Sequence, residues 1–227
     1  VEYTNEESGF SHPGVGLTKD MLDTVQTMVN SGEDPWITYY NDMLESSYAS
    51  KSITINLSDP VNTSYNSQGT NSKFIKDALA AYTQAILYYV TGDNAYRKNC
   101  MNIIRSYEQL SPDKYAYFTD ACIHTGIPMN RFCMALEIMR YSTYQVTEGY
   151  TEEELKWTDE DTDSIINNLL QPSVNTFMSS NDEFMNQHLY TTIGAMSAYL
   201  FMDDVEGYEK TVEWFTVNAD GANPGFN

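Results

Sequence analysis

Apolar side chains recur along this chain at intervals of three and four residues, and this spacing restricts its fold more than any other feature. Segments with such a period carry one apolar stripe, which they bury against other helices. No stretch shows the sustained alternation of apolar and polar residues that indicates a half-buried strand. The sequence therefore predicts an all-α protein.

Start and stop signals divide the periodic segments into pairs. Serine, threonine or aspartate precedes several of them, and glycine or proline follows. The expected helices cover about residues 18–32, 34–49, 72–91, 93–111, 129–146, 162–177, 186–202 and 205–217. Two polar stretches, 50–71 and 111–128, separate pairs of helices and are predicted to be loops.

Four consecutive antiparallel pairs, with short turns within a pair and longer loops between pairs, are typical of concentric helical barrels and helical solenoids. No repeat of fixed period with a recurring motif is present, which disfavours helical repeat arrays. A compact bundle of eight helices is the alternative. We prefer an α/α toroid, here an incomplete helical barrel of consecutive hairpins, formed by residues 1–227 as a single domain.

The charge of the chain excludes several partners. Its 32 acidic and 12 basic residues give a net charge of −20. Such a charge repels nucleic acid and anionic membrane surfaces, and no apolar run is long enough to span a membrane. We expect no nucleic acid and no membrane as partners.

Three weaker signals bear on location and metals. Two glycosylation-type triplets begin at Asn56 and Asn62, which favours a secreted or periplasmic protein, and the chain starts without a signal peptide, which would have been removed. Three cysteines are too few for a disulfide framework. The acidic run 159–163 lacks the glycine and the bidentate glutamate of a calcium loop, because Ser164 and Leu170 stand there. We expect no metal and no cofactor.

Several short segments occur in an order that indicates a family. They are His12-Pro13-Gly14, Asp34-Pro35-Trp36, residues 89–96 (YVTGDNAY), residues 135–140 (ALEIMR) and residues 186–190 (NQHLY). Together they resemble the alginate lyase-like polysaccharide lyases of the chondroitin AC/alginate lyase superfamily. The resemblance implies an α/α toroid with a cleft across one end, and cleavage of an alginate or glucuronan type of uronate polymer by β-elimination. Such toroids continue beyond the last helix found here, so a missing segment or a second chain would complete the barrel.

Elimination at a uronate needs a group that neutralises the carboxylate, a base for the neighbouring C–H proton and an acid for the departing oxygen. Asn186 is the candidate for the first task, because a neutral amide can hydrogen-bond the charge that develops. His188 is the candidate base, since histidine exchanges a proton near neutral pH. The resemblance places an Asn and a His in this motif, and Tyr190 lies beside them as a less certain catalytic residue.

Two further residues fall in or after the second predicted loop. His124 is a candidate catalytic residue, and Arg131 is a candidate for binding a substrate carboxylate through two parallel hydrogen bonds. His12 precedes a Pro-Gly turn and is expected to anchor a loop. Trp36 and Tyr40 could stack on a sugar, but their spacing of four residues favours the core.

Two other functions remain open at this point. A glycoside hydrolase on the same toroid would need two carboxylates flanking the bond, for which Glu137 and Asp120 are conceivable. A non-catalytic glycan-binding domain would keep the aromatic cleft without the base. We rank the lyase first, acting on an anionic polysaccharide, then the binding domain, then the hydrolase.

Overall fold

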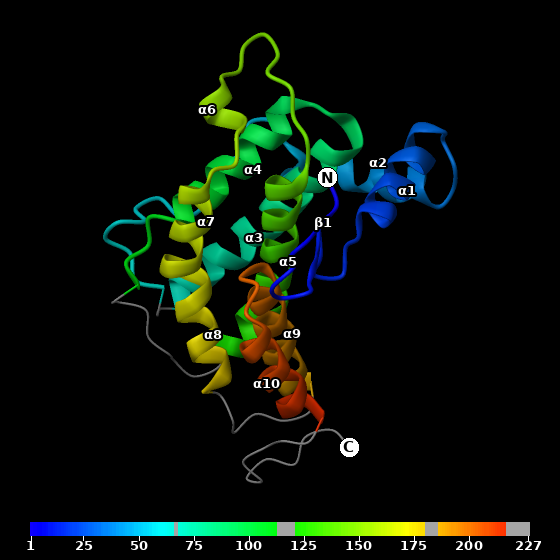
Figure 1. Ribbon diagram of the computed structural model, residues 1–227. Helices are drawn as coiled ribbons and strands as arrows, with labels where there is room; N and C mark the ends of the chain where they lie inside the picture. The colour runs from blue at the N-terminus through cyan, green and yellow to red at the C-terminus, as the bar shows by residue number, and fades with distance from the viewer. Residues whose placement is uncertain (66–67, 113–120, 180–185, 217–227) are drawn as a thin grey trace.

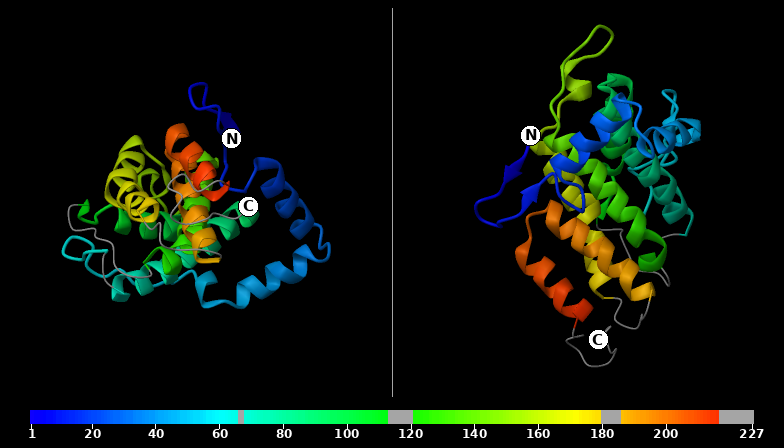
Figure 2. Two further views of the ribbon diagram at one scale, coloured as in Figure 1. Left: turned by 90° about the horizontal axis from the view of Figure 1, so that it is seen from below. Right: turned by 90° about the vertical axis from the view of Figure 1, so that its right-hand side faces the viewer.

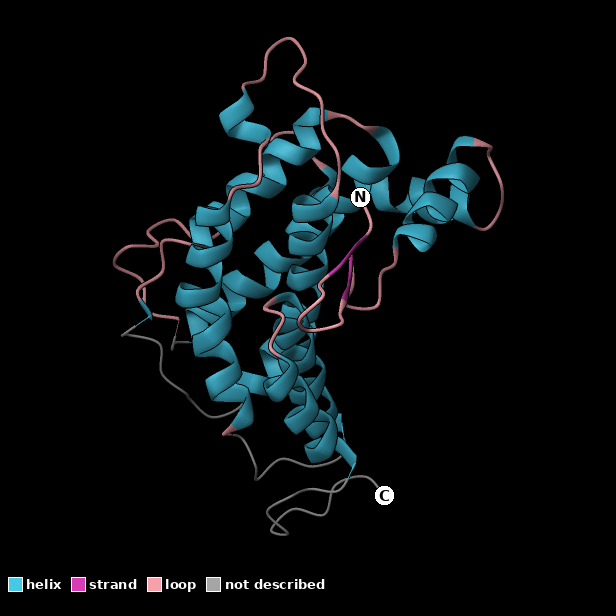
Figure 3. Ribbon diagram, viewed as in Figure 1, coloured by secondary structure: helices cyan, strands magenta, loops and turns pink. Residues whose placement is uncertain are grey.

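The computed structural model describes residues 1–65, 68–112, 121–179 and 186–216. Helices make up most of this part of the chain and pack against one another (Figures 1 and 3), so the prediction of an all-α fold is confirmed. The two described strands are β1 (Tyr3–Thr4) and β2 (Ser11–His12). The described helices are α1 (Lys19–Asn30), α2 (Trp36–Glu45), the 3-10 turn η1 (Ser47–Ala49), α3 (Gln68–Thr91), α4 (Asn94–Tyr107), α5 (Ala121–Tyr141), α6 (Glu152–Leu155), α7 (Asp159–Ile165), the π-helical turn η3 (Ile166–Leu170), α8 (Gln171–Met178), α9 (Asn186–Phe201) and α10 (Val205–Thr216).

The predicted capping residues lie where the helices begin. The Thr18 hydroxyl accepts a hydrogen bond from the Met21 amide at 3.2 Å, and the Asp93 carboxylate accepts one from the Ala95 amide at 2.9 Å. These bonds satisfy backbone donors that have no partner inside the helix. Gly92 has a φ of 69°, a left-handed conformation that glycine adopts without strain after a helix.

Three boundaries differ from the predictions. The N-terminal arm, expected to be irregular, forms a short antiparallel hairpin in which Tyr3 pairs with His12. Helix α3 begins at Gln68, inside the predicted loop. Helix α5 begins at Ala121 and continues through Pro128 to Tyr141, whereas the sequence predicted a loop before a helix of residues 129–146. Proline removes one backbone donor, and the close packing of α5 on α9 outweighs that loss.

Helices α3, α5 and α9 lie side by side and run in the same direction. Phe74 of α3 contacts Phe132 of α5, with ring centroids 5.5 Å apart. In the last turn of α3, the Tyr88 hydroxyl donates at 2.7 Å to the carbonyl of Thr143, just past the end of α5. The Asn130 amide donates to the Ser197 hydroxyl at 2.8 Å, which fixes α5 beside α9. These three helices form one layer of the molecule.

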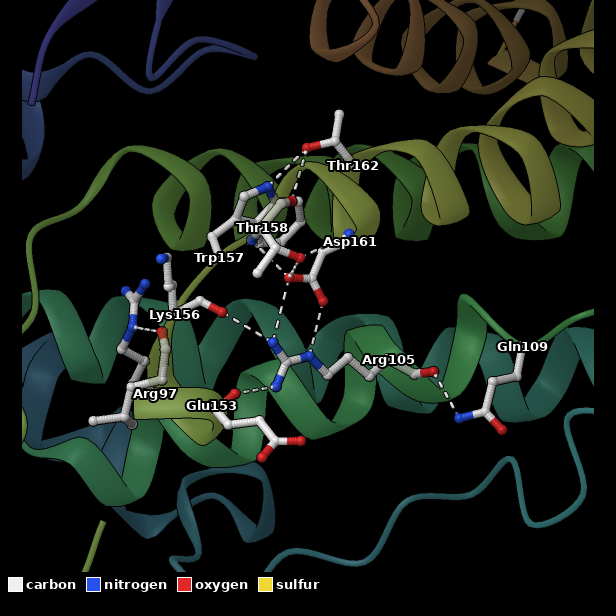
Figure 4. Close-up of polar contacts among 10 residues, drawn as sticks. Arg97, Arg105, Gln109, Glu153, Lys156, Trp157, Thr158, Asp161 and Thr162 are labelled. Carbon is white, nitrogen blue, oxygen red and sulfur yellow. Dashed lines mark hydrogen bonds and ion pairs between the residues drawn. The ribbon is translucent and has the colours of Figure 1, made fainter. Parts of the chain in front are cut away.

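Helix α4 and the continuous segment α7–η3–α8 form a second layer, antiparallel to the first. The Arg105 guanidinium near the end of α4 donates to the Asp161 carboxylate at 2.8 Å and to the carbonyls of Glu153 and Lys156 (Figure 4). Asp161 also accepts from the Thr158 amide and hydroxyl, at 2.7 Å each. The acidic run 159–163 therefore begins helix α7 and forms an ion pair with Arg105 through Asp161.

Helices α1 and α2 lie at one side of the molecule, opposite α7 and α8 (Figures 1 and 2). Helix α1 packs on α2 and α3, and α2 packs on α1 and η1. Among the described helices, no extensive contact joins this hairpin to α9 or α10 and closes a ring. The structure therefore shows layers of packed helices, and the toroid remains a prediction.

Candidate functional site

The candidate residues are brought together where α5 crosses α9. A Cβ added at Gly126 would lie 2.0 Å from the Tyr190 carbonyl oxygen, and one at Gly194 would lie 2.9 Å from the Gly126 Cα. The two backbones therefore touch, which only glycine permits. Because α5 and α9 run in parallel, His124 lies at the same end of the helix pair as Asn186.

The exposed stripes of the two helices carry most of the predicted site residues. His124 and Arg131 are seven residues apart on α5 and therefore share a face. His124 is exposed and Arg131 is half-buried. On α9, Asn186 is exposed and Tyr190, four residues later, is half-buried. His124, Asn186 and Tyr190 thus lie in the N-terminal parts of α5 and α9, and Arg131 lies at the middle of α5.

Arg131 is held by its neighbours in a defined position. Its guanidinium donates to the Asn130 side-chain oxygen at 3.3 Å and lies over the Tyr82 ring of α3, 5.2 Å from the centroid. Asn130 in turn donates to Ser197 of α9, so this pair of adjacent residues links α5 to α3 through Arg131 and to α9 through Asn130. No carboxylate of the described residues pairs with it. The remaining donors of Arg131 can therefore bind an external anion.

His188 does not lie with these residues. Positions two apart on a helix point to opposite sides, and Asn186 is exposed whereas His188 is only 3% exposed. The imidazole packs edge-on against the Trp214 ring of α10, with centroids 4.6 Å apart. Burial lowers the pKa of His188, while a backbone hydrogen bond with Trp214 raises it less. The imidazole is therefore neutral at neutral pH, but it faces α10.

His12 anchors the N-terminal hairpin, in agreement with the role expected for it. Its ring is fully buried; Nδ1 lies 2.9 Å from a Glu137 oxygen, and Nε2 lies 3.2 Å from an Asp203 oxygen. Burial lowers the pKa of His12, but the hydrogen bonds and charges of Glu137 and then Asp203 outweigh that effect and raise it. The same Glu137 accepts from the Gly14 amide at 2.7 Å. This cluster ties the hairpin to the end of α5 and to the turn before α10.

The Glu137 contacts also bear on the hydrolase alternative. Glu137 is fully buried and holds His12 and the Gly14 amide, so it does not face an open cleft. Asp120, the other carboxylate considered, lies outside the described residues. Within the described ranges, no three His, Cys, Asp or Glu side chains form a group that could hold a metal ion.

The neighbours of Arg131 were missed by the sequence analysis. Tyr82, Asn130 and Ser197 come from three helices, and no local pattern joins them. The sequence shows only that Asn130 directly precedes Arg131, and this does not indicate which helices the two side chains contact. Which helix faces this pair is decided by tertiary packing.

Comparison with known proteins adds no identification. No family model and no curated protein matches the chain. No described helix is both long and apolar enough to cross a membrane.

Proposed function

We propose that the chain is a polysaccharide lyase that cleaves a uronic-acid polymer of the alginate or glucuronan type by β-elimination. The observation that carries the proposal is the parallel contact of α5 and α9, because it brings His124 and Asn186 to one end of the helix pair. Arg131 lies on the same face of α5 as His124 and has no carboxylate partner among the described residues. An amide, a histidine and a cation on two neighbouring helices suit an anionic sugar.

Each residue has one task in this proposal. Arg131 binds a carboxylate of the polymer, a local attraction that opposes the net charge of −20. Asn186 hydrogen-bonds the carboxylate of the reacting uronate and stabilises the charge that develops on it. Removal of the proton beside that carboxylate forms a carbon–carbon double bond, and the glycosidic C–O bond breaks. Tyr190 donates a proton to the departing oxygen.

The two candidate bases, His124 and His188, differ in solvent exposure. A base must come within hydrogen-bonding reach of the proton that it removes. The side chain of His124 is exposed on α5, so we assign the role of base to it. His188 remains the alternative base, since burial favours its neutral form, and it requires the polymer to reach the α9–α10 side.

The proposal includes the architecture and location that the resemblance implies. The layers formed by α3, α5 and α9 and by α4, α7 and α8 are compatible with part of an α/α toroid. A further segment or a second chain would complete the barrel in this view. A lyase of this kind acts on an extracellular polymer, in accordance with a secreted or periplasmic location.

The test is the ultraviolet absorbance of the unsaturated uronate that elimination produces. The purified chain is incubated in parallel with alginate, glucuronan and hyaluronan. We expect absorbance to rise on at least one polymer, and to be abolished by His124→Ala and by Asn186→Ala but not by Tyr39→Ser on α2. His188→Gln, measured together with its thermal melting curve, separates the two bases: activity lost at an unchanged Tm would move the base to His188.

A glycan-binding domain without catalysis is the second candidate. The separation of His188 from Asn186 favours it, because the two residues expected to act together lie on opposite sides of α9. This function predicts no absorbance change on any polymer. It predicts instead that alginate in a native gel retards the protein, and that Arg131→Ala abolishes the retardation.

A further inference from the structure

An apolar cleft lies between the α1–α2 hairpin and α3. Its volume is about 260 Å³. The side chains around it are almost entirely aromatic and aliphatic, and include Met21, Trp36, Tyr39, Tyr40, Met43 and Tyr82. Met21 is 52% exposed and Tyr39 is 68% exposed at its mouth. Large apolar patches left open in this way mark binding surfaces.

Helix α2 is the least covered helix of the hairpin. None of its residues is buried, although its sequence has a clear apolar face. Trp36 and Tyr40, whose spacing favoured the core, are half-buried and line the cleft, and Tyr40 also packs against the edge of the core. Helix α2 rests on α1 and η1 without extensive contact with α3. The apolar face of α2 is therefore available to a partner.

The size of the cleft indicates what it can hold. Pockets for drug-sized molecules have volumes of roughly 300–1,000 Å³, above the 260 Å³ found here. A cavity of roughly 150 Å³ accommodates benzene. The cleft thus has room for about one or two large side chains. Methionines at two positions of the lining allow it to adapt to their shape.

The charge of the hairpin decides among possible occupants. Residues 17–46 contain six carboxylates and one lysine, Lys19. That lysine already pairs with Asp23. Asp20, Glu33 and Asp42 are exposed. A second copy of this chain, an anionic polymer and an anionic membrane would all meet like charge here, whereas a basic partner would be attracted.

We infer that this cleft binds an amphipathic helix of a partner protein, with an apolar stripe bordered by lysine or arginine. A helix placed in a groove inserts apolar side chains at positions i, i+3 or i+4 and i+7. One or two of them fill the cleft between α2 and α3, and the basic residues of the partner lie against the exposed carboxylates of α1 and α2. The cleft borders the proposed lyase site at Tyr82, whose ring also lies under Arg131, but the inference does not depend on the lyase activity.

The probe is a fluorescein-labelled synthetic peptide of about five helical turns, with leucines on one face and lysines elsewhere. Its binding is followed by fluorescence anisotropy at physiological salt. Because the whole chain is acidic, attraction by charge alone must be separated from docking. Met21→Asp does this: added negative charge would strengthen binding by charge alone, but a carboxylate at the mouth of the cleft opposes insertion of leucine.

We expect Met21→Asp to weaken binding by roughly tenfold or more, the cost of leaving one large apolar side chain unburied. The matched control is Val212→Asp, which adds the same charge at a residue of α10 that is 37% exposed. It should leave binding unchanged. Equal or tighter binding of Met21→Asp would overturn the inference, as would failure of the wild-type chain to bind the peptide.

Two further readouts exclude other occupants. Light scattering of the wild type and Met21→Asp detects a second copy in the cleft, and a dimer that Met21→Asp dissociates would overturn the inference. Labelled alginate oligosaccharide is tested without the peptide, because the polyanion would bind the lysines of the peptide directly. Oligosaccharide binding that Met21→Asp weakens and Val212→Asp does not would assign the cleft to sugar and would also overturn the inference. A monomer whose oligosaccharide binding is unaffected by Met21→Asp, but whose peptide binding is weakened by it, supports the docking of a basic helix.

Discussion

The contact between α5 and α9 and the α1–α2 hairpin represent two opposite ways of placing an amphipathic helix. At Gly126 and Gly194 the backbones touch, and α5 is buried between α3 and α9. In α2 no residue is buried, and its apolar face borders an open cleft. Helix α2 has one clear apolar face, whereas α5 carries apolar residues on all sides and residues 132–139 are all buried. An apolar face by itself therefore does not state what covers it.

Truncation of a core ring should have the largest effect. Phe132 of α5 is fully buried and contacts the rings of Phe74 and Tyr107. We expect Phe132→Ala to lower the free energy of unfolding by about 3–5 kcal/mol. Tyr39→Ala on α2 should change it by less than about 0.5 kcal/mol. Urea denaturation followed by circular dichroism measures both, and equal losses would show that α2 is buried as deeply as α5.

A methyl group at the helix crossing should have the next largest effect. Gly→Ala inside a helix ordinarily stabilises by up to about 1 kcal/mol. The Cβ of Gly126→Ala would meet the Tyr190 carbonyl, so we expect a loss of about 1–3 kcal/mol. Thr24→Ala, at an exposed position of α1, should gain a few tenths of a kcal/mol. Thermal melting compares them, and a stabilised Gly126→Ala would mean that α5 and α9 lie further apart.

The two buried histidines should respond to pH in opposite directions. The pKa of His12 is raised above its usual 6.5 by the carboxylates of Glu137 and Asp203, against the effect of burial. Its stabilisation is complete below pH 6.5 and is lost as the pH rises through the folded-state pKa. The pKa of His188 is lowered by burial from 6.5. As the pH falls below 6.5, the unfolded chain binds a proton at His188 that the folded chain does not bind, so the free energy of unfolding decreases.

Urea unfolding between pH 5 and 9 tests this difference. Relative to His12→Gln, the wild type should lose stability as the pH rises above 6.5. Relative to His188→Gln, it should lose stability as the pH falls below 6.5. The same direction for both would contradict the contacts described for one of the two rings.

The smallest effect is expected at the start of α1. Thr18→Ala removes the hydroxyl that accepts from the Met21 amide, a change that costs about 0.5–1 kcal/mol. Because the hairpin has few buried contacts, we expect it to open locally. Hydrogen exchange should therefore accelerate in α1 while the amides of α5 and α9 keep their rates. Equal acceleration in all three helices would indicate one cooperative unit.

The candidate site was only partly accessible from the sequence. The sequence named candidate residue types, which stay a prediction, and the anchoring role of His12 follows from its place before the Pro-Gly turn. The sequence analysis treated Asn186 and His188 as one motif and expected them to act together. Because α9 begins at Asn186, both residues lie on a helix and their side chains point to different sides. The motif fixes their spacing, and the helix turns them to opposite sides.

The sequence by itself determined the helical class and the caps at Thr18 and Asp93, because these depend on residues within a few positions of one another. Only the tertiary structure decided that α5 continues through Pro128, that α5 and α9 run in parallel, and that α2 remains uncovered. These outcomes depend on contacts between residues far apart in the chain. A local pattern records which side chains are apolar, and the packing of distant helices decides which of them are covered.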